Sequence, residues 1–276
     1  MTEPETPREA WDEDEYQHLR LTRQGFAAIV TLDRPELHNA FNERLISEIQ
    51  RAFERLSEAE DIRAVVLQGA GKSFCAGADL NWMRASLDFT HDENIADALK
   101  LSDMLRAIDT CRHPVIGRIH GAALGGGAGL IAVCDIAIAA EGTRFGFTEA
   151  RLGIAPAVIS QCVVPKIGQS HARALFLTAE RFDAQRALAI GLIHQVVPLD
   201  ELDAAVTKTL SEIGQNGPAG VRAAKTLART VTSLQPDEAR QTTAATIAGL
   251  RVSPEGQEGI RAFLEKRRAA WVSDDV

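Results

Sequence analysis

The sequence predicts an α/β fold in which a largely parallel sheet is followed by an all-helical C-terminal region. Two observations predict it. Strand and helix patterns alternate through the first two thirds of the chain, as is typical of a parallel sheet with crossover helices. From about Asp200 the strand patterns disappear and four helical segments follow one another. The breaks between these segments are Asn216-Gly217-Pro218, Gln235-Pro236 and Ser253-Pro254.

The first elements along the chain are a hairpin and a helix. The segments His18–Arg23 and Phe26–Asp33 have strand character, meet at Gln24 and Gly25, and are predicted to pair as a hairpin. Asn42 is a typical N-cap for the helix that follows. The apolar face of this helix is predicted at Leu45, Ile49, Ala52, Phe53 and Leu56.

The alternating part of the chain continues with three strands and two helices. Strands are predicted at Ala64–Gly69, Pro114–Ile119 and Ile136–Ala140. A helix at Asp92–Arg112 separates the first two strands, and a short helix separates the last two. The apolar stripe of the longer helix is predicted at Ile95, Leu99, Met104, Leu105 and Ile108.

The composition of the chain argues against several classes of function. The 276 residues are 45% hydrophobic and carry a formal net charge of −8, which argues against a nucleic-acid partner. Apolar stretches fall short of the roughly 20 residues that span a membrane. The acidic residues 1–16 do not resemble a signal peptide and are predicted to be a disordered leader, so a soluble cytoplasmic protein is expected. Four scattered cysteines favour reduced core thiols over a zinc site or disulfides.

Two glycine-rich turns, Phe74–Leu80 and His120–Leu130, each follow an apolar strand and leave bare backbone N–H groups. A substrate oxygen that becomes negative during reaction needs about two such donors, shielded from water. Glycines that merely permit tight packing are the alternative for either turn alone. A GxGxxA pattern at Gly127, Gly129 and Ala132 is a weak dinucleotide fingerprint because its helix is too short. No GxSxG nucleophile turn is present.

The order of these motifs resembles the enoyl-CoA hydratase/isomerase (crotonase) superfamily. The segments that carry the resemblance are LDRPELHNAFN, VVLQGAGKSFCAGADL, HPVIGRIHGAALGGGAGLIAVCDIAIAAE, FGFTEARLGIAP and GIRAFLEKRRAAW. The resemblance implies a spiral of ββα units over residues 17–199 and a helical trimerisation region over residues 200–276. It also implies a homotrimer or a homohexamer built as a dimer of trimers.

The resemblance assigns chemistry to three positions. The backbone N–H groups of Ala78 and Gly126 are implied to hold the thioester carbonyl oxygen, and Glu149 to move the proton. Hydratases of this family usually carry a second glutamate, and its position is occupied here by Gly129. From local sequence alone Glu149 could instead open a short helix, and Asp79 is predicted to stabilise a helix start.

The resemblance further implies that coenzyme A enters as part of the substrate, with no separate cofactor and no metal. Its contacts are implied at Lys266 and Phe263 of a neighbouring subunit and at His38 and Ala76. Arg84 or Arg34 is expected to replace the basic residues that relatives carry where this chain has His38 and Asn81. Without the resemblance, the basic run at Lys266 is typical of a solvated helix end.

The predicted activity is therefore the addition of water to a 2-enoyl-CoA thioester. AGADLNWM at Ala76–Met83 and EARLGIAPAVIS at Glu149–Ser160 resemble methylglutaconyl-CoA hydratases, which favours a branched or glutaconyl-type acyl group. Because one glutamate can also shuttle a proton between carbons, a Δ3,Δ2-enoyl-CoA isomerase is the alternative. A catalytically weak acyl-CoA-binding protein is a third possibility.

Overall fold

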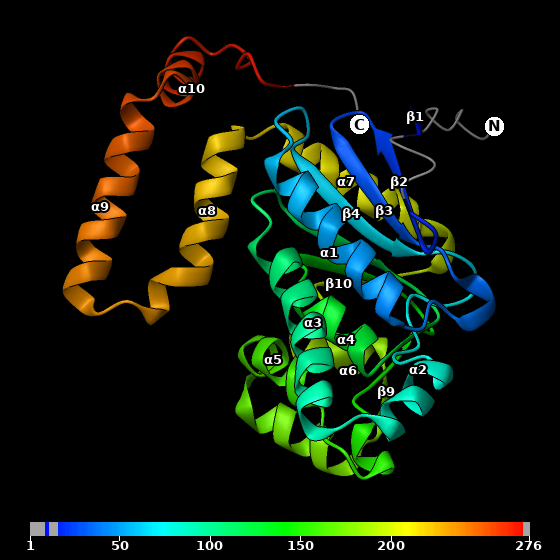
Figure 1. Cartoon of the computed structure of the whole chain (residues 1–276). Helices are drawn as coiled ribbons and strands as arrows, with labels where there is room; N and C mark the ends of the chain where they lie inside the picture. Colours follow the sequence, from blue (N-terminus) through cyan, green and yellow to red (C-terminus); the bar gives the residue numbers. More distant parts are fainter. Residues whose placement is uncertain (1–8, 11–15, 273–276) are drawn as a thin grey trace.

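The computed structural model describes residues 9–10 and 16–272, and its centre is a seven-stranded sheet (Figure 1). The strand order is β1-β2-β3-β4-β5-β7-β10. The first three strands pair antiparallel, and β3 through β10 pair parallel. Their bounds are β1 Glu9–Ala10, β2 Leu19–Gln24, β3 Ala27–Leu32, β4 Ala64–Gly69, β5 Val115–Ile119, β7 Ile136–Ala140 and β10 Gln195–Val197.

The predicted hairpin and parallel strands are confirmed. β2 and β3 meet at Gly25, whose φ of 51° suits a glycine turn. Every residue of β3 and of β4 is buried, as in a sheet that is covered on both faces. Most of the predicted leader lies outside the described residues. Within it, Glu9–Ala10 pairs with β2, and Tyr16 is buried.

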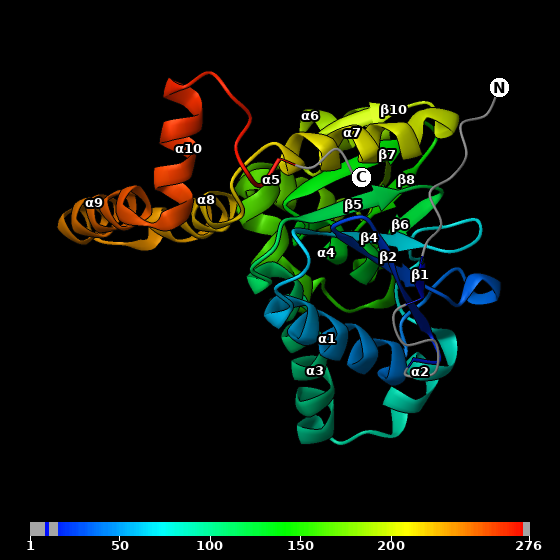
Figure 2. The same ribbon diagram turned by 90° about the horizontal axis from the view of Figure 1, so that it is seen from above.

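Helices cover both faces of the sheet. Figure 2 shows α1 (Glu43–Glu58), α3 (His91–Thr110) and α4 (Gly126–Ala132) on one side and α7 (Leu202–Gly214) on the other. Alternate residues of β4 enter the two cores, because side chains alternate across a strand. Asn42 caps α1 by accepting from the Leu45 N–H, as predicted.

The predicted apolar stripe of α3 is correct in its second half and wrong in its first. Met104 and Leu105 are buried, and so is Ile108, but Ile95 is 47% exposed and Leu99 is 56% exposed. The helix begins at His91, with Thr90 as its cap in a capping box with Glu93. The first turns of α3 therefore present a different face to the interior than the apolar pattern suggests.

Several short elements were not predicted from sequence. A second sheet has the order β6-β8-β9, with three residues in each strand. Its strands are β6 Ala122–Leu124, β8 Arg144–Gly146 and β9 Arg181–Asp183. Two short helices, α2 and α6, and the long α5 complete the body of the molecule; their bounds are Leu80–Ala85, Ala184–Ala189 and Ala157–Thr178.

The C-terminal region is helical, as predicted, and each of its last three helices begins with proline. These helices are α8 (Pro218–Thr230), α9 (Pro236–Val252) and α10 (Pro254–Leu264). Figures 1 and 2 show α9 and α10 projecting away from the sheet. No residue of α8 or α9 is buried; most residues of α8 are half-buried, whereas most residues of α9 are exposed in a single subunit.

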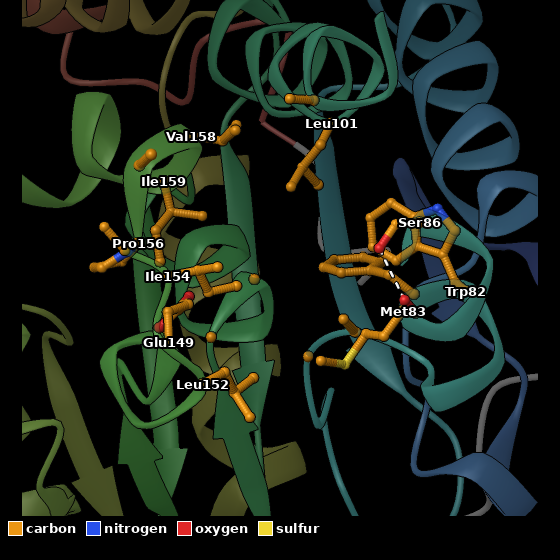
Figure 3. A pocket seen from close by; sticks show the side chains of 18 of the residues that line it. Trp82, Met83, Ser86, Leu101, Glu149, Leu152, Ile154, Pro156, Val158 and Ile159 are labelled. Atoms are coloured by element: carbon orange, nitrogen blue, oxygen red, sulfur yellow. Dashed lines mark hydrogen bonds between the residues drawn. The ribbon is translucent and has the colours of Figure 1, made fainter. Parts of the chain in front are cut away.

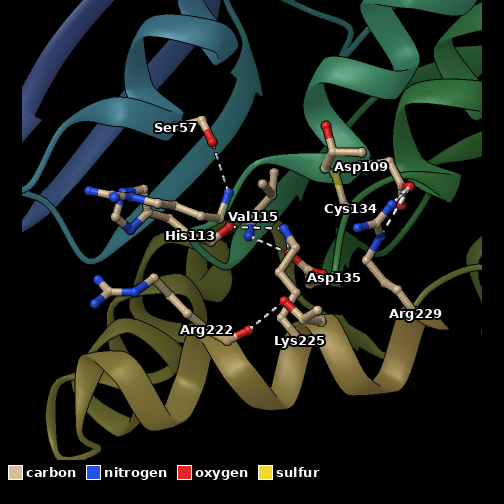
Figure 4. A network of polar contacts seen from close by, with 12 residues as sticks. Ser57, Asp109, His113, Val115, Cys134, Asp135, Arg222, Lys225 and Arg229 are labelled. Atoms are coloured by element: carbon tan, nitrogen blue, oxygen red, sulfur yellow. Dashed lines mark hydrogen bonds and ion pairs between the residues drawn. The ribbon is translucent and has the colours of Figure 1, made fainter. Parts of the chain in front are cut away.

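Polar contacts anchor α8 to the body of the molecule (Figure 4). The ammonium group of Lys225 lies 2.7 Å from a carboxylate oxygen of Asp135 and donates to the carbonyl of His113. The same carboxylate accepts from the Val115 N–H at the start of β5. These contacts tie α8 to the N-terminal ends of β5 and β7 in the interior of the central sheet.

Candidate active site

A pocket of about 360 Å³ lies between the two glycine-rich turns and the helices around them. In Figure 3, Trp82 and Met83 of α2 lie across the pocket from Ile154 and Ile159. Its lining residues come from the two turns, α2, α3 and the segment from Thr148 to the start of α5: Phe41, Ala76, Gly77, Ala78, Trp82, Met83, Ser86, Asn94, Asp97, Ala98, Leu101, Gly125, Gly126, Thr148, Glu149, Leu152, Ile154, Ala155, Pro156, Ala157, Val158 and Ile159.

The two glycine-rich turns lie against one another. Cys75 forms a parallel bridge with Ala123, and its carbonyl accepts from the Leu124 N–H at 3.0 Å. A Cβ atom on Gly77 would lie only 2.9 Å from the Leu124 carbonyl oxygen, so only glycine allows this approach. Segments about fifty residues apart in sequence are thus joined into one wall of the pocket.

Both proposed donors directly follow a glycine with positive φ. Gly77 has φ 95° and precedes Ala78, and Gly125 has φ 51° and precedes Gly126. L-residues other than glycine rarely adopt this conformation, so these two positions require it. Neither the Ala78 N–H nor the Gly126 N–H donates a hydrogen bond within residues 9–10 and 16–272. Gly126 is the first residue of α4, where helical N–H groups have no partner within the helix.

The segment before α1 holds the first glycine-rich turn in place. A guanidinium nitrogen of buried Arg34 lies 2.7 Å from a carboxylate oxygen of buried Asp79. The Asn39 side chain donates to the carbonyls of Ala70, Ser73 and Phe74, which form the loop leading into the turn. The predicted helix-start role of Asp79 is confirmed, because it caps α2 by accepting from the Asn81 N–H.

Replacing Asp79 with Asn should lower the free energy of unfolding at pH 7 by about 3 kcal/mol. The substitution leaves the Arg34 guanidinium buried without its counter-charge, and breaking such a pair typically costs about 3–5 kcal/mol. Asn keeps an oxygen that can accept from the Asn81 N–H, which places the loss at the low end. Urea denaturation of both proteins measures the difference.

The loss of unfolding free energy caused by Asp79→Asn should be smaller in acid. Burial alone would raise the pKa of Asp79, but hydrogen bonds from Arg34 and from the Asn81 N–H outweigh it, and the pKa lies below its usual value. The stability from this ionised carboxylate is fully present above the unfolded-state pKa of about 3.9, and it declines as the pH falls from there through the folded-state pKa. An equal loss at pH 3 and pH 7 would contradict this interpretation.

Glu149 begins a short 3-10 helix, Glu149–Leu152, and its side chain reaches into the pocket (Figure 3). One carboxylate oxygen is buried and has no hydrogen-bond partner among the described residues. Burial raises the pKa of Glu149, partly offset by a hydrogen bond from its own backbone. A carboxyl group in this setting holds a proton at higher pH than an exposed glutamate, which suits it to proton transfer.

The position of the family's second glutamate is closed by packing. Gly129 is buried in α4, and a Cβ atom there would lie 2.5 Å from Cγ2 of Ile159. The Leu105 side chain lies beyond it, at 3.9 Å from that position. Any side chain at this position would displace Ile159 from the pocket wall.

A carboxylate that was not predicted as a site residue also lines the pocket. Asp97 lies on α3, on the same face as Asn94, Ala98 and Leu101, all of which reach the pocket. The spacing of these four residues is that of one helical face. The sequence feature that could have indicated Asp97 is its position, with Asn94, on the helix face that is buried further along at Leu105.

The predicted coenzyme A contacts are not all brought together in one subunit. Ala76 lines the pocket, and exposed His38 contacts the Ser73 hydroxyl at 3.0 Å beside it. Arg84 lies on α2, outside the lining, and contacts Asn81.

Lys266 and Phe263 lie at the end of the projecting α10, where Phe263 is 83% exposed. Arg34, the other predicted substitute, is buried and forms an ion pair with Asp79.

Two histidines outside the pocket lining make protein contacts. His113 and His120 each contact a backbone carbonyl, and burial lowers the pKa of His113 to about 4. The four cysteines are unpaired. Among the described residues, no group of three or more His, Cys, Asp or Glu side chains forms a metal site, and no helix is long and apolar enough to cross a membrane.

Comparisons with known proteins agree with this geometry. Residues 22–274 match the sequence model of the enoyl-CoA hydratase/isomerase family. An enoyl-CoA hydratase from Shewanella pealeana is 41% identical with a TM-score of 0.90, over 94% of this chain and 97% of that one. An enoyl-CoA hydratase from Mycobacterium smegmatis is 32% identical with a TM-score of 0.89, over 93% of this chain and 100% of that one.

A crotonyl-CoA hydratase from Syntrophomonas wolfei is 32% identical over 260 residues, which is 94% of this chain and 99% of its own. The crotonase-like fold predicted from sequence is therefore confirmed. Because the family match extends over almost the entire described chain and includes both glycine-rich turns and Glu149, the chain belongs to the enoyl-CoA hydratase/isomerase family.

Proposed function

We propose that this protein adds water to the double bond of a 2-enoyl-CoA thioester. One observation carries the proposal: a single pocket holds the N–H groups of Ala78 and Gly126, which donate to no protein acceptor in the described part of the chain, together with a half-buried Glu149. Two convergent donors suit an oxygen that gains negative charge, and a half-buried carboxyl group suits proton transfer beside it.

The proposed chemistry follows from where charge develops. The thioester oxygen becomes an enolate oxygen as a nucleophile adds to the conjugated double bond, so donors that are already in place stabilise this state more than the bound substrate. Gly126 is the first residue of α4, where the positive end of the helix dipole favours the same charge. Glu149 supplies the proton to carbon. The coenzyme A group belongs to the substrate, and we propose no separate cofactor.

We further propose a branched or glutaconyl-type acyl group. The two stretches that resemble methylglutaconyl-CoA hydratases supply the two walls of the pocket. The first contributes Trp82 and Met83, and the second contributes Ile154 and Ile159 (Figure 3). A pocket between such walls can take an acyl chain with a substituent near its double bond.

The packing at Gly129 favours one alternative activity. With no glutamate at this position, Glu149 could instead move a proton between two carbons of a 3-enoyl-CoA, which would make the protein an isomerase. A weakly active acyl-CoA-binding protein would use the same pocket without turnover.

An assay with three esters separates these functions. Purified protein is mixed with crotonyl-CoA, 3-methylglutaconyl-CoA or a 3-enoyl-CoA, and the absorbance of the 2-enoyl thioester is followed. The proposed hydratase lowers the absorbance with the first two esters, and faster with the branched one. A rise with the 3-enoyl ester alone would indicate an isomerase, and no change with any ester would indicate a binding protein.

We also propose that the projecting C-terminal helices pack on neighbouring subunits in a trimer or hexamer and complete the coenzyme A site there. Arg267 forms ion pairs with Glu258 and Glu265, whereas Lys266 forms no ion pair within the described residues. Its ammonium group is exposed and available to a phosphate. A monomer in light scattering at micromolar concentration would contradict the assembly.

Replacing Lys266 with Ala should raise the KM for the CoA ester several-fold and leave kcat unchanged. A phosphate contact far from the reacting carbons is equally strong in the ground and transition states. The difference in KM should shrink in high salt, because salt screens an exposed ion pair. Lys208, an exposed lysine on α7, provides the control substitution to Ala. The role of Lys266 fails if both variants bind the ester as wild type does.

A further inference from the structure

The inner face of α3 changes its chemistry along the helix. Toward its C-terminal end it buries Met104, Leu105 and Ile108 in the core. Toward its N-terminal end the same face lines the pocket with Asn94, Asp97 and Ala98. Asn94 is exposed and Asp97 is half-buried, so both side chains are accessible to a molecule in the pocket.

The two polar side chains of this face differ in their partners. The Asn94 amide donates to the carbonyls of Phe89 and Thr90 and thereby stabilises the start of the helix. Asp97 forms no hydrogen bond or ion pair in the part of the chain that the structure describes. Lys100, the cation nearest to it in sequence on this helix, forms its ion pair with Glu43 of α1 at 2.5 Å and attracts Asp97 only weakly. The oxygens of Asp97 are therefore available to a molecule in the pocket.

Asp97 and Glu149 come from different walls of the pocket. Figure 3 shows Leu101 of α3 across the pocket from Glu149, and Asp97 lies one helical turn before Leu101 on the same face. The usual position for a second carboxylate is unavailable, since Ile159 occupies the space beside Gly129. α3 thus brings a carboxylate to the site from another direction.

We infer that Asp97 is the second catalytic carboxylate of this site and takes the proton of the attacking water. The inference rests on the proposed hydratase function. Water binds between Asp97 and the acyl chain, and its oxygen is held toward the β-carbon. The isomerase reaction needs no such water, so Asp97 would be dispensable for it.

The proposed step balances in atoms and charge. It begins with Asp97 ionised and Glu149 protonated. One O–H bond of water breaks, its proton passes to Asp97, and its oxygen bonds to the β-carbon. The π electrons move to the thioester oxygen, which accepts hydrogen bonds from the N–H groups of Ala78 and Gly126. The enolate then takes the Glu149 proton at the α-carbon, and exchange with solvent in the open pocket restores both carboxyl groups.

Two reactions of the same protein test the assignment. Hydration of a 2-enoyl-CoA ester needs both carboxyl groups, whereas exchange of the α-hydrogen of butyryl-CoA with D₂O needs only Glu149 and the two N–H donors. Asp97→Asn should lower the hydration rate about a hundredfold or more, within the range for a lost general base, and change the exchange rate less than threefold. Asp103→Asn, on the same helix but outside the pocket lining, is the matched control and should match wild type in both reactions.

Further outcomes separate the assignment from the function on which it rests. Asp97→Ala opens space for a small acid, and added formate should restore part of its hydration rate. If Asp97→Asn hydrates the ester within threefold of wild type, or loses exchange as fully as hydration, the assignment is wrong while the hydratase function stands. If the wild-type protein hydrates neither crotonyl-CoA nor 3-methylglutaconyl-CoA, both the assignment of Asp97 and the proposed hydratase function are wrong. Nearly unchanged thermal unfolding of the variants, expected because Asp97 forms no hydrogen bond or ion pair among the described residues, shows that the fold is intact.

Discussion

Glu149→Gln should lower the hydration rate by roughly 10²–10⁴, the range for a lost general acid or base. The substitution keeps the size and polarity of the side chain and removes its exchangeable proton. Binding of the CoA ester should persist, because the N–H groups of Ala78 and Gly126 remain. Turnover is measured from the 2-enoyl absorbance, and affinity by calorimetry with a saturated ester.

Glu141→Gln is the matched control, since Glu141 is an exposed glutamate on a turn outside the pocket lining. It should leave turnover unchanged. A Glu149→Gln protein that keeps most of a robust wild-type activity would show that another carboxyl group donates the proton. Asp97 would then be the first to examine.

Gly126→Pro should cost about 3–4 kcal/mol in transition-state stabilisation, which corresponds to the loss of one donor from an oxyanion site. Proline lacks the N–H, and its fixed φ is tolerated at the first position of a helix, which Gly126 occupies in α4. The substitution also adds a side chain, and a Cβ atom at Gly126 would lie 2.6 Å from the ring of Phe41. The two effects have to be separated.

Gly126→Ala separates them, because alanine makes the same contact with Phe41 and keeps the N–H. The ratio of kcat/KM between the alanine and proline variants therefore excludes the contribution of the Cβ contact with Phe41. We expect a ratio of about 10²–10³. Equal activities in two folded variants, as judged by circular dichroism, would remove Gly126 from the oxyanion site.

Several elements of the fold could be predicted from sequence because they carry their own patterns. β4 and β7 have the predicted bounds, and Asn42 caps α1 as predicted. The strands of the second sheet are three residues long, too short for an alternation to show, and they form through pairing with distant partners. On α3, Ile95 and Leu99 were assigned to the interior because they are apolar, whereas polar residues occupy that face.

In the candidate site, too, residues in local motifs could be predicted and contacts between distant segments could not. The glycine-rich turns and Glu149 lie in local motifs, and the structure brings their residues into one pocket. The ion pair of Arg34 could not be predicted, for a different reason. Its partner Asp79 lies 45 positions away, and the pairing depends on the turn geometry that the fold creates. Asp97 was missed because an acidic residue in the first turns of a helix is ordinarily a solvated one.

The contact between Gly129 and Ile159 sets the order in which this active site could acquire a different pair of acids. A glutamate introduced at position 129 meets Cγ2 of Ile159 at its first side-chain atom, so that change alone disrupts the pocket wall before it can contribute chemistry. A smaller residue at position 159 has to come first. That first change leaves a cavity and brings no catalytic gain of its own. The two positions are therefore epistatic, and the one-glutamate arrangement is separated from the two-glutamate arrangement by an intermediate that selection for activity would not favour.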